Sequence, residues 1–354
     1  MQAPSLIKGR GAQIYTENRF AKNTYIKAFW EGIDEDVDHV ADKTQYIEVY
    51  PKSIINEVSS ADLPLEYSMN PYQGCEHGCL YCYARESHQY WGYDAGVGFE
   101  QNILVKKNAP QLLEETFQKP NWKVKTIMLS GNTDCYQPAE RTYGITRKLL
   151  ELCLKYKHPV GIITKNALIE RDLDILKALN AEGLVHVSIS ITTLNEDLRA
   201  VLEPRTVTAK RKLKTVQLLA EHGIPVNVMM APVIPGLNSH EIFDVAKAAA
   251  EAGAIDFHHA VVRLNGSIAQ VFTDWVRKVF PDRADKVIHG IEDCHGGKLS
   301  DSRVGIRMRG EGQTAEMLRQ MVKTAKQKFF IGTGIQPLNT NSFVRNKRGQ
   351  LSMF

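Results

Sequence analysis

The sequence predicts an α/β protein whose main domain is a partial barrel of six β/α units. Three observations lead to this prediction. From residue 65 short β-rich runs alternate with longer helical stretches, the alternation repeats six times, and it stops after residue 265. Alternating strands and helices favour a parallel sheet with right-handed crossovers. Because six units are too few for a closed eight-stranded barrel, we expect an open partial barrel or a doubly wound sheet.

Each predicted strand is a short run rich in β-branched or aromatic residues, and each predicted helix carries apolar side chains at helical spacing. Leu149, Leu150 and Cys153 repeat in this way, and Ser239 and Gly253 suit the start and the stop of a helix. The strands are expected at 65–69, 124–129, 160–164, 185–191, 225–231 and 257–264. The helices between them are expected at 138–156, 168–180, 208–221 and 239–252.

The chain is expected to divide into three parts, an N-terminal extension (1–60), the α/β domain (61–265), and a helical C-terminal region with a basic tail (266–354). Residues 1–60 have weak periodicity, so little regular structure is expected there. Beyond residue 265 two or three helices are expected, near 269–280, 282–293 and 314–328.

Composition indicates a globular protein, with 43% hydrophobic and 24% charged residues in 354. No apolar run approaches the length of about 18 residues that indicates a membrane span. The first residues also lack the apolar stretch of a secretory signal. We therefore expect a cytoplasmic protein that does not act at a membrane.

The net charge of +4 is too small to argue for a nucleic-acid partner by itself, but the charge is uneven. From Arg303 to the end there are ten lysines and arginines against two acidic residues. Such a basic region fits phosphate binding, and it fits a solvated tail equally well. Nucleic acid is therefore one candidate partner of this region.

Six cysteines are present, and three of them, Cys75, Cys79 and Cys82, fall within eight residues. Clustered cysteines in a cytoplasmic protein bind metal or carry out chemistry more often than they form disulfides. The C-x3-C-x2-C loop directly follows the first predicted strand, and Gly74 and Gly78 let its backbone wrap closely.

Three thiolates can hold three corners of a [4Fe–4S] cluster, which leaves one iron without a protein ligand. The amino and carboxylate groups of S-adenosylmethionine would take that iron, and one electron from the cluster would break the sulfonium bond to give a 5′-deoxyadenosyl radical. Tyr81, just before the third cysteine, suits contact with adenine. The alternative is a structural zinc site with His77 or a distant residue as fourth ligand, although no second cysteine pair is present.

Six segments together resemble the radical S-adenosylmethionine (SAM) superfamily over roughly residues 61–265, and within it the group related to spore photoproduct lyase. They are NPYQGCEHGCLYCY at 70–83, SGNTDCYQPAE at 130–140, TKNA at 164–167, EPR at 203–205, APVIPGLN at 231–238 and DSRVGIRMRGE at 301–311. The resemblance implies the partial radical SAM barrel, the cluster and SAM as cofactors. It also implies an external electron donor of the flavodoxin or ferredoxin kind.

The resemblance further implies a set of SAM contacts at successive strand ends. Thr133 and Asp134 match a pair that contacts the methionine amino group, and Lys165 matches a lysine that holds the carboxylate. Ser190 matches a serine near the ribose or methionine, and the backbone of Ala231 would meet adenine.

One departure from the lyase pattern concerns the hydrogen donor. The lyase has a cysteine before the Thr/Ser-Asp pair, where this chain has Gly131, whereas Cys135 follows Asp134. Cys135 is a candidate hydrogen donor, with a small packed residue as the alternative. Faithful repair of spore photoproduct is therefore not implied.

Three functions stay open at this point. The first is radical chemistry on nucleic acid, and the second is radical chemistry on a peptide, a protein or a small metabolite. The third is a zinc-stabilised binding module without catalysis.

Overall fold

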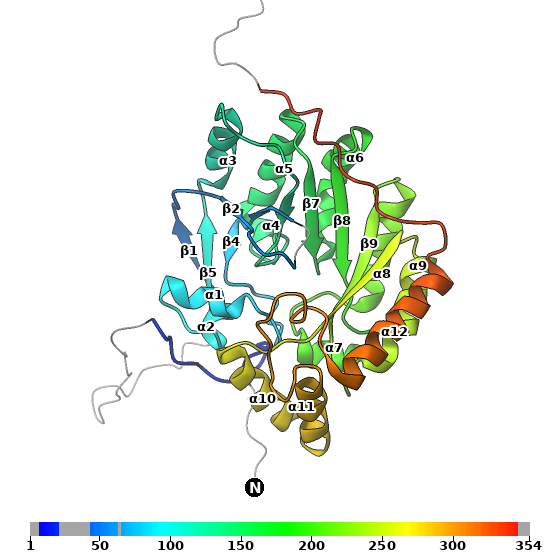
Figure 1. The fold of residues 1–354 in the computed structure, drawn as a ribbon. Helices are drawn as coiled ribbons and strands as arrows, with labels where there is room; N and C mark the ends of the chain where they lie inside the picture. Colours follow the sequence, from blue (N-terminus) through cyan, green and yellow to red (C-terminus); the bar gives the residue numbers. More distant parts are fainter. Residues whose placement is uncertain (1–6, 21–42, 63–64, 346–354) are drawn as a thin grey trace, which may run out of the picture.

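A seven-stranded sheet forms the centre of the computed structural model, which describes residues 7–20, 43–62 and 65–345 (Figure 1). Six strands are parallel and one edge strand, β2, is antiparallel to β3; the order is β10-β9-β8-β7-β6-β3-β2. The predicted six β/α units and the open sheet are thereby confirmed. The strands are β2 (Ile55–Glu57), β3 (Tyr67–Met69), β6 (Ile127–Leu129), β7 (Val160–Thr164), β8 (Val185–Ser190), β9 (Val226–Val233) and β10 (Asp256–Val261).

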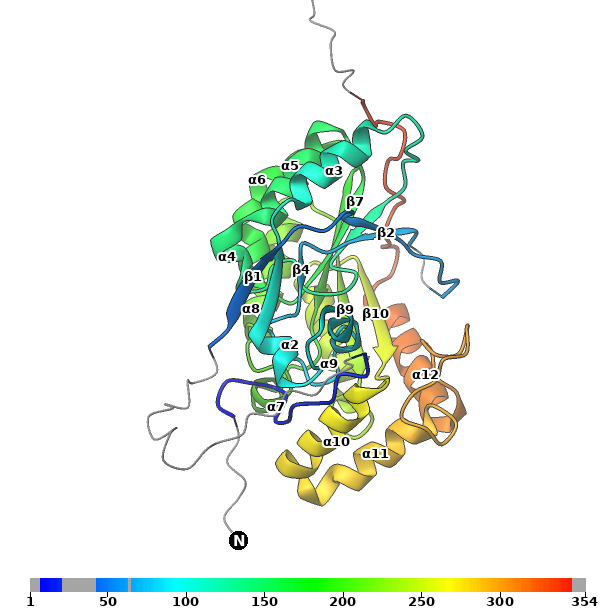
Figure 2. The ribbon, with the colours of Figure 1, turned by 90° about the vertical axis from the view of Figure 1, so that its left-hand side faces the viewer.

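Helices connect the parallel strands and lie against one side of the sheet (Figure 2). In chain order after β6 they are α4 (Glu140–Tyr143), α5 (Ile145–Lys155), α6 (Leu173–Ala181), α7 (Glu196–Leu202), α8 (Ala209–Glu221) and α9 (Ile242–Glu251). The single helix predicted at 138–156 is wrong, because Gly144 adopts a left-handed conformation (φ 59°) and ends α4. The Glu140 carboxylate then accepts the Thr146 backbone N–H (2.9 Å) in the first turn of α5.

The two faces of the sheet differ in polarity. Side chains such as Ile162, Val187 and Val228 point toward the helices and form the main apolar core. Because side chains alternate along a strand, the residues between them face the other way. The register places Ser190 beside Met229 on that second, concave face.

A second, three-stranded sheet was not predicted. It has the order β1-β5-β4, with β1 (Gln45–Val49), β4 (Tyr72–Gln73) and β5 (Asn102–Lys106). Three unpredicted helices lie in the same region, namely α1 (Arg85–His88), α2 (Val97–Gln101) and α3 (Ala109–Gln118). The described part of the N-terminal extension therefore contains β1 and β2, which are short strands whose partners lie elsewhere in the sequence.

Three helices form the C-terminal region, as predicted. They are α10 (Ser267–Val279), α11 (Ala284–Asp293) and α12 (Gly312–Phe329). The segment after α12 runs back across the amino ends of the strands (Figure 1), where the Asn339 N–H donates to the Gly183 carbonyl (2.9 Å). No helix in the described ranges is long and apolar enough to span a membrane.

Candidate functional site

The cysteine loop leaves the carboxyl end of β3 and is held from several directions. The Cys75 N–H donates to the Phe99 carbonyl (3.0 Å), and the Arg85 Nε donates to the Cys79 carbonyl (3.0 Å). Gly78 has a left-handed φ of 69°, and a Cβ there would lie 2.8 Å from a Glu100 carboxylate oxygen. A glycine is therefore required at this position.

A fully buried ion pair packs against the cysteine loop and stabilises it. Arg85 and Glu100 have no exposed surface and meet at 2.6 Å. The Glu100 carboxylate also accepts the backbone N–H groups of Gly11 and Ala12 (2.9 and 2.8 Å). The N-terminal segment thereby packs on the cysteine loop, so closely that a Cβ at Gly11 would lie 1.7 Å from the carbonyl oxygen of residue 78.

The three thiols of the loop interact electrostatically with one another. Cys75 and Cys79 are buried, and Cys82 is half-buried. Burial raises the pKa of each thiol, whereas Arg85 and Lys165 act to lower the pKa of Cys82. Nearby cations of this kind favour the thiolate form, which is the form that binds metal.

A buried carboxylate, Glu203, connects this loop to the end of β7. It accepts hydrogen bonds from the hydroxyls of Tyr81 and Thr192, the latter at 2.6 Å. It also lies 3.3 Å from the Lys165 ammonium and 3.0 Å from the Lys212 ammonium. Burial acts to raise the pKa of Glu203, but the two lysines and the hydrogen bonds hold it well below its usual range. Lys165 lies over the Tyr81 ring at 5.6 Å, so these two predicted residues are brought together.

Asp134 lies beside this network, but donors of the protein itself occupy its carboxylate. It accepts from the Thr164 hydroxyl and from the backbone N–H groups of Tyr136 and Lys165, each at 2.8 Å. His77 Nδ1 lies 3.4 Å away. Burial acts to raise the pKa of Asp134, but His77 and these hydrogen bonds hold it below its usual value. The hydrogen bonds of Asp134 thus join the loop after β6 to the carboxyl end of β7.

The remaining predicted residues fall into two groups. Ser190 and Ala231 lie near the carboxyl ends of β8 and β9, on the concave face. Thr133 is buried and donates its hydroxyl to the Tyr72 carbonyl (2.6 Å), so the hydroxyl already has a partner.

Cys135 is fully buried and belongs to the main apolar core. Its N–H donates to the Ser130 hydroxyl (2.7 Å), and burial raises the pKa of its thiol well above the usual value. The thiol therefore lies in the apolar core, and its part as a hydrogen donor stays a prediction.

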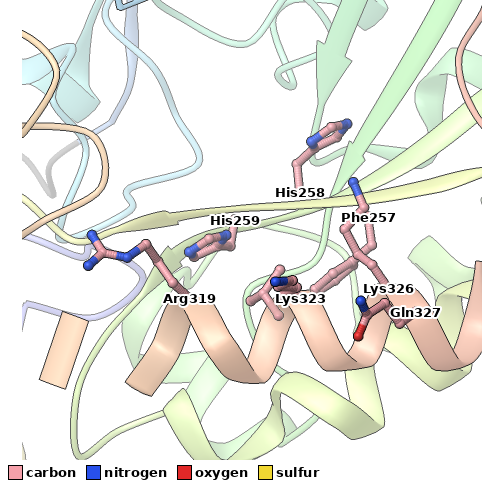
Figure 3. A pocket seen from close by; sticks show the side chains of 8 residues that line it. Phe257, His258, His259, Arg319, Lys323, Lys326 and Gln327 are labelled. Atoms are coloured by element: carbon pink, nitrogen blue, oxygen red, sulfur yellow. The ribbon is translucent and has the colours of Figure 1, made fainter. Parts of the chain in front are cut away.

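An open cavity of about 510 Å³ lies between β10 and α12, outside the site described above. Figure 3 shows His259 and Phe257 on the side of β10 that faces α12, and His258 on the other side. The cavity lining is Phe257, His258, His259, Arg319, Val322, Lys323, Lys326 and Gln327. None of the predicted site residues lines it.

Comparison with known proteins assigns the family. The model of the radical SAM superfamily matches residues 69–249. An uncharacterized protein of Mycobacterium tuberculosis is 32% identical over 244 residues, which cover 68% of this chain and 72% of that protein. The chain belongs to the radical SAM superfamily. It is therefore an enzyme, and the predicted superfamily is confirmed.

Two further similarities bear on this radical SAM protein. Spore photoproduct lyase in complex with a dinucleoside spore photoproduct has a TM-score of 0.59 over 82% of each chain, at 16% identity. The two proteins therefore share a fold. The antilisterial bacteriocin subtilosin biosynthesis protein AlbA of Bacillus subtilis is 26% identical over 198 residues, or 56% of this chain and 39% of AlbA.

The residues of this radical SAM protein fit the two cofactors that the superfamily implies. Three interacting thiols on one shielded loop, with cations beside them, are a suitable donor set for an iron–sulfur cluster. His77, the zinc ligand considered from sequence, instead contacts Asp134 and Asn166. Within the described ranges, no group of three His, Cys, Asp or Glu side chains is placed to hold a single metal ion.

Several supporting residues were missed in the sequence. Glu203 belongs to the EPR motif at 203–205, but no nearby residue indicated that its carboxylate would contact Tyr81, which is 122 residues away. Arg85 and Glu100 gave no signal at all, because a buried ion pair and a surface pair have the same residue types.

Proposed function

We propose that this protein binds one [4Fe–4S] cluster through Cys75, Cys79 and Cys82, binds SAM beside it, and acts on nucleic acid. When bound, these cofactors supply a 5′-deoxyadenosyl radical by one-electron cleavage of SAM. The network around Glu203 carries the proposal, because it joins Tyr81 of the cysteine loop to Lys165 at the end of β7.

Each residue of the network has a distinct part in this proposal. The Lys165 ammonium is a partner for the SAM carboxylate, and Tyr81 offers its ring to adenine. Burial alone would lower the pKa of Lys165, but Glu203 holds it above its usual value, so the lysine stays charged. Asp134 accepts the Lys165 backbone N–H and so orients the lysine. The Asp134 carboxylate already accepts three protein donors, so we assign it a supporting part, whereas the Thr133 oxygen can still accept a hydrogen bond from the SAM amino group.

The cofactor proposal is tested by anaerobic reconstitution of the full chain with iron, sulfide and a reductant. We expect about four irons per chain, the visible iron–sulfur absorbance, and formation of 5′-deoxyadenosine from SAM. The triple variant Cys75→Ala, Cys79→Ala, Cys82→Ala should lose all three signals. Cys153→Ala, a change at a buried helix cysteine far along the chain, serves as the control and should keep them. Iron retained by the triple variant, or zinc alone in the wild type, would refute the assignment.

The substrate is the less constrained half of the proposal. Nucleic acid is favoured by the basic C-terminal region and by the fold shared with a lyase that binds a dinucleoside photoproduct. A peptide substrate is the alternative, since AlbA is named for bacteriocin biosynthesis. Transfer of deuterium from labelled oligonucleotides or labelled peptides into 5′-deoxyadenosine separates the two. Label arriving only from peptides would end the nucleic-acid proposal.

A further inference from the structure

One half-buried arginine, Arg263, lacks a hydrogen-bond or ion-pair partner within the described part of the chain, although the nearby Arg303 and Arg307 are paired. Arg263 is half-buried and makes no hydrogen bond or ion pair with any residue that the structure describes. The other buried or half-buried arginines of the described ranges each have a carboxylate or carbonyl partner. They are Arg10, Arg85, Arg147, Arg199, Arg205, Arg211, Arg307 and Arg319.

The backbone around Arg263 is held firmly, two residues beyond β10. The Val262 N–H donates to the Val233 carbonyl and the Leu264 N–H to the Leu299 carbonyl, each at 2.9 Å. Val262 and Leu264 are buried in an apolar cluster that also contains Tyr81. Because side chains alternate in an extended segment, Arg263 points away from that cluster.

The groups around Arg263 do not neutralise it. Burial and the neighbouring Arg307 lower the pKa of Arg263, while Asp62 and Asp301 act in the opposite direction. Those two carboxylates, however, already pair with Arg307 and Arg303. A partly desolvated guanidinium without a partner costs free energy, which a bound anion would offset.

An exposed aromatic ring lies within electrostatic reach of the same arginine. Tyr83 directly follows the third cysteine of the loop and interacts with both Cys82 and Arg263. Its hydroxyl donates to the Gly131 carbonyl (2.6 Å), which fixes the ring, and yet 53% of the residue is exposed. Arginine binds phosphate through a planar fork of donors, and exposed aromatic rings stack on unpaired bases.

We propose that Arg263 binds a phosphate group of a nucleic-acid substrate and that the exposed Tyr83 ring provides a surface for a base. This inference rests on the proposed function and specifies how that site takes its substrate. It assigns the phosphate contact to one half-buried residue, whereas the paired Arg303 and Arg307 keep a structural part.

The test compares Arg263→Gln with Arg277→Gln, a change at an exposed arginine of α10. Binding of a fluorescein-labelled single-stranded oligonucleotide to the reconstituted protein is followed by anisotropy over a range of salt concentrations. We expect Arg263→Gln to weaken binding about tenfold at low salt and to reduce the slope of log affinity against log salt by about one. Arg277→Gln should match the wild type.

Two measurements keep the inference falsifiable. Removing an unpaired cation should leave the thermal midpoint unchanged or higher, so a lower midpoint would identify Arg263 as a structural cation and overturn the inference. Binding by Arg263→Gln equal to that of the wild type would overturn it as well, as would tighter binding of an acidic peptide than of the oligonucleotide. Anisotropy needs no radical chemistry, so a wild type that forms no 5′-deoxyadenosine would refute the proposed cofactor chemistry and leave the binding comparison intact.

Discussion

The Glu203 carboxylate is the most heavily used polar group of the site, and its neutralisation gives the sharpest prediction. It is fully buried, accepts hydrogen bonds from Tyr81, Thr192 and Lys212, and forms an ion pair with Lys165. Glu203→Gln keeps the shape of the side chain and removes its charge. The Lys212 side chain, only 2% exposed, then stays in the interior without a counter-charge.

The expected cost follows from that burial. Removing one partner of a buried ion pair destabilises a protein by about 3–5 kcal/mol, because the other charge is left desolvated. For a chain of this size we expect the thermal midpoint to fall by on the order of 10 °C. Glu251→Gln is the matched control, since Glu251 forms an exposed pair with Lys247 at 3.8 Å and should cost less than about 1 kcal/mol.

Urea unfolding followed by circular dichroism measures the loss of unfolding free energy in Glu203→Gln and in Glu251→Gln, and a thermal scan gives the midpoint. A double variant tests whether the unpaired lysine causes the loss. Glu203→Gln with Lys212→Met removes both charges of the closest pair, so it should recover roughly 1–3 kcal/mol relative to Glu203→Gln alone. A loss of less than about 1 kcal/mol in Glu203→Gln, or a double variant no more stable than the single one, would refute the reasoning.

Three further predictions concern the supports of the site and the core. Arg85→Met should cost about 3–5 kcal/mol in urea unfolding, because it leaves the Glu100 carboxylate buried without its partner. Gly11→Ala should release the N-terminal segment, since the added Cβ would overlap the Gly78 carbonyl oxygen, and hydrogen exchange over residues 7–20 should then rise. Burial lowers the pKa of His158 to about 4 from 6.5, so its neutral form is favoured in the fold and stability falls as the pH drops from 6.5 toward 4. Between pH 7 and pH 5 the loss from this group is about 2 kcal/mol, and His158→Phe should lose that much less than the wild type.

Each of these predictions has its own contrary result. The prediction for Arg85→Met would be wrong if this variant lost no more unfolding free energy than Lys247→Met, which removes one partner of an exposed ion pair. For Gly11→Ala the contrary result is exchange no faster than in Gly334→Ala, where an added Cβ meets nothing within 4 Å. For His158→Phe it is a pH dependence identical to that of the wild type.

The sequence predicted the main sheet well, because its signals are local. All six parallel strands, and the helices α5, α6, α8 and α9 between them, follow from the alternation of β-rich and amphipathic runs, whereas α1, α2, α3 and α7 were not predicted. The strands β1, β2, β4 and β5 escaped prediction, since they lie outside the β/α alternation and each is defined by its pairing with another segment. The break between α4 and α5 at Gly144 was also missed. The Glu140 carboxylate accepts the Thr146 N–H at the start of α5, and nothing in the sequence indicated this contact.

The predicted site residues also divide into those that local sequence could identify and those whose contacts depend on distant residues. The cysteine spacing and Lys165 could be found from their neighbours in the chain, because a loop motif and a strand end are local features. The solvent access of Cys135 was not predictable, since a residue near a strand end can face either side of the sheet and this one faces the core. Thr133 and Asp134 were placed at the correct edge, but their hydrogen-bond partners lie as far away as residues 72 and 164.

The linear sequence thus decides the β/α rhythm and the three thiols of one loop, because both depend on residues within a few positions of each other. Only the tertiary structure decides the charges that surround these thiols. Arg85 pairs with Glu100, Glu203 pairs with two lysines, and Arg263 has no hydrogen-bond or ion-pair partner in the described ranges. The reason is physical: the cost or gain of a charge depends on its burial and on what lies within a few ångströms, and neither quantity exists until the chain has folded.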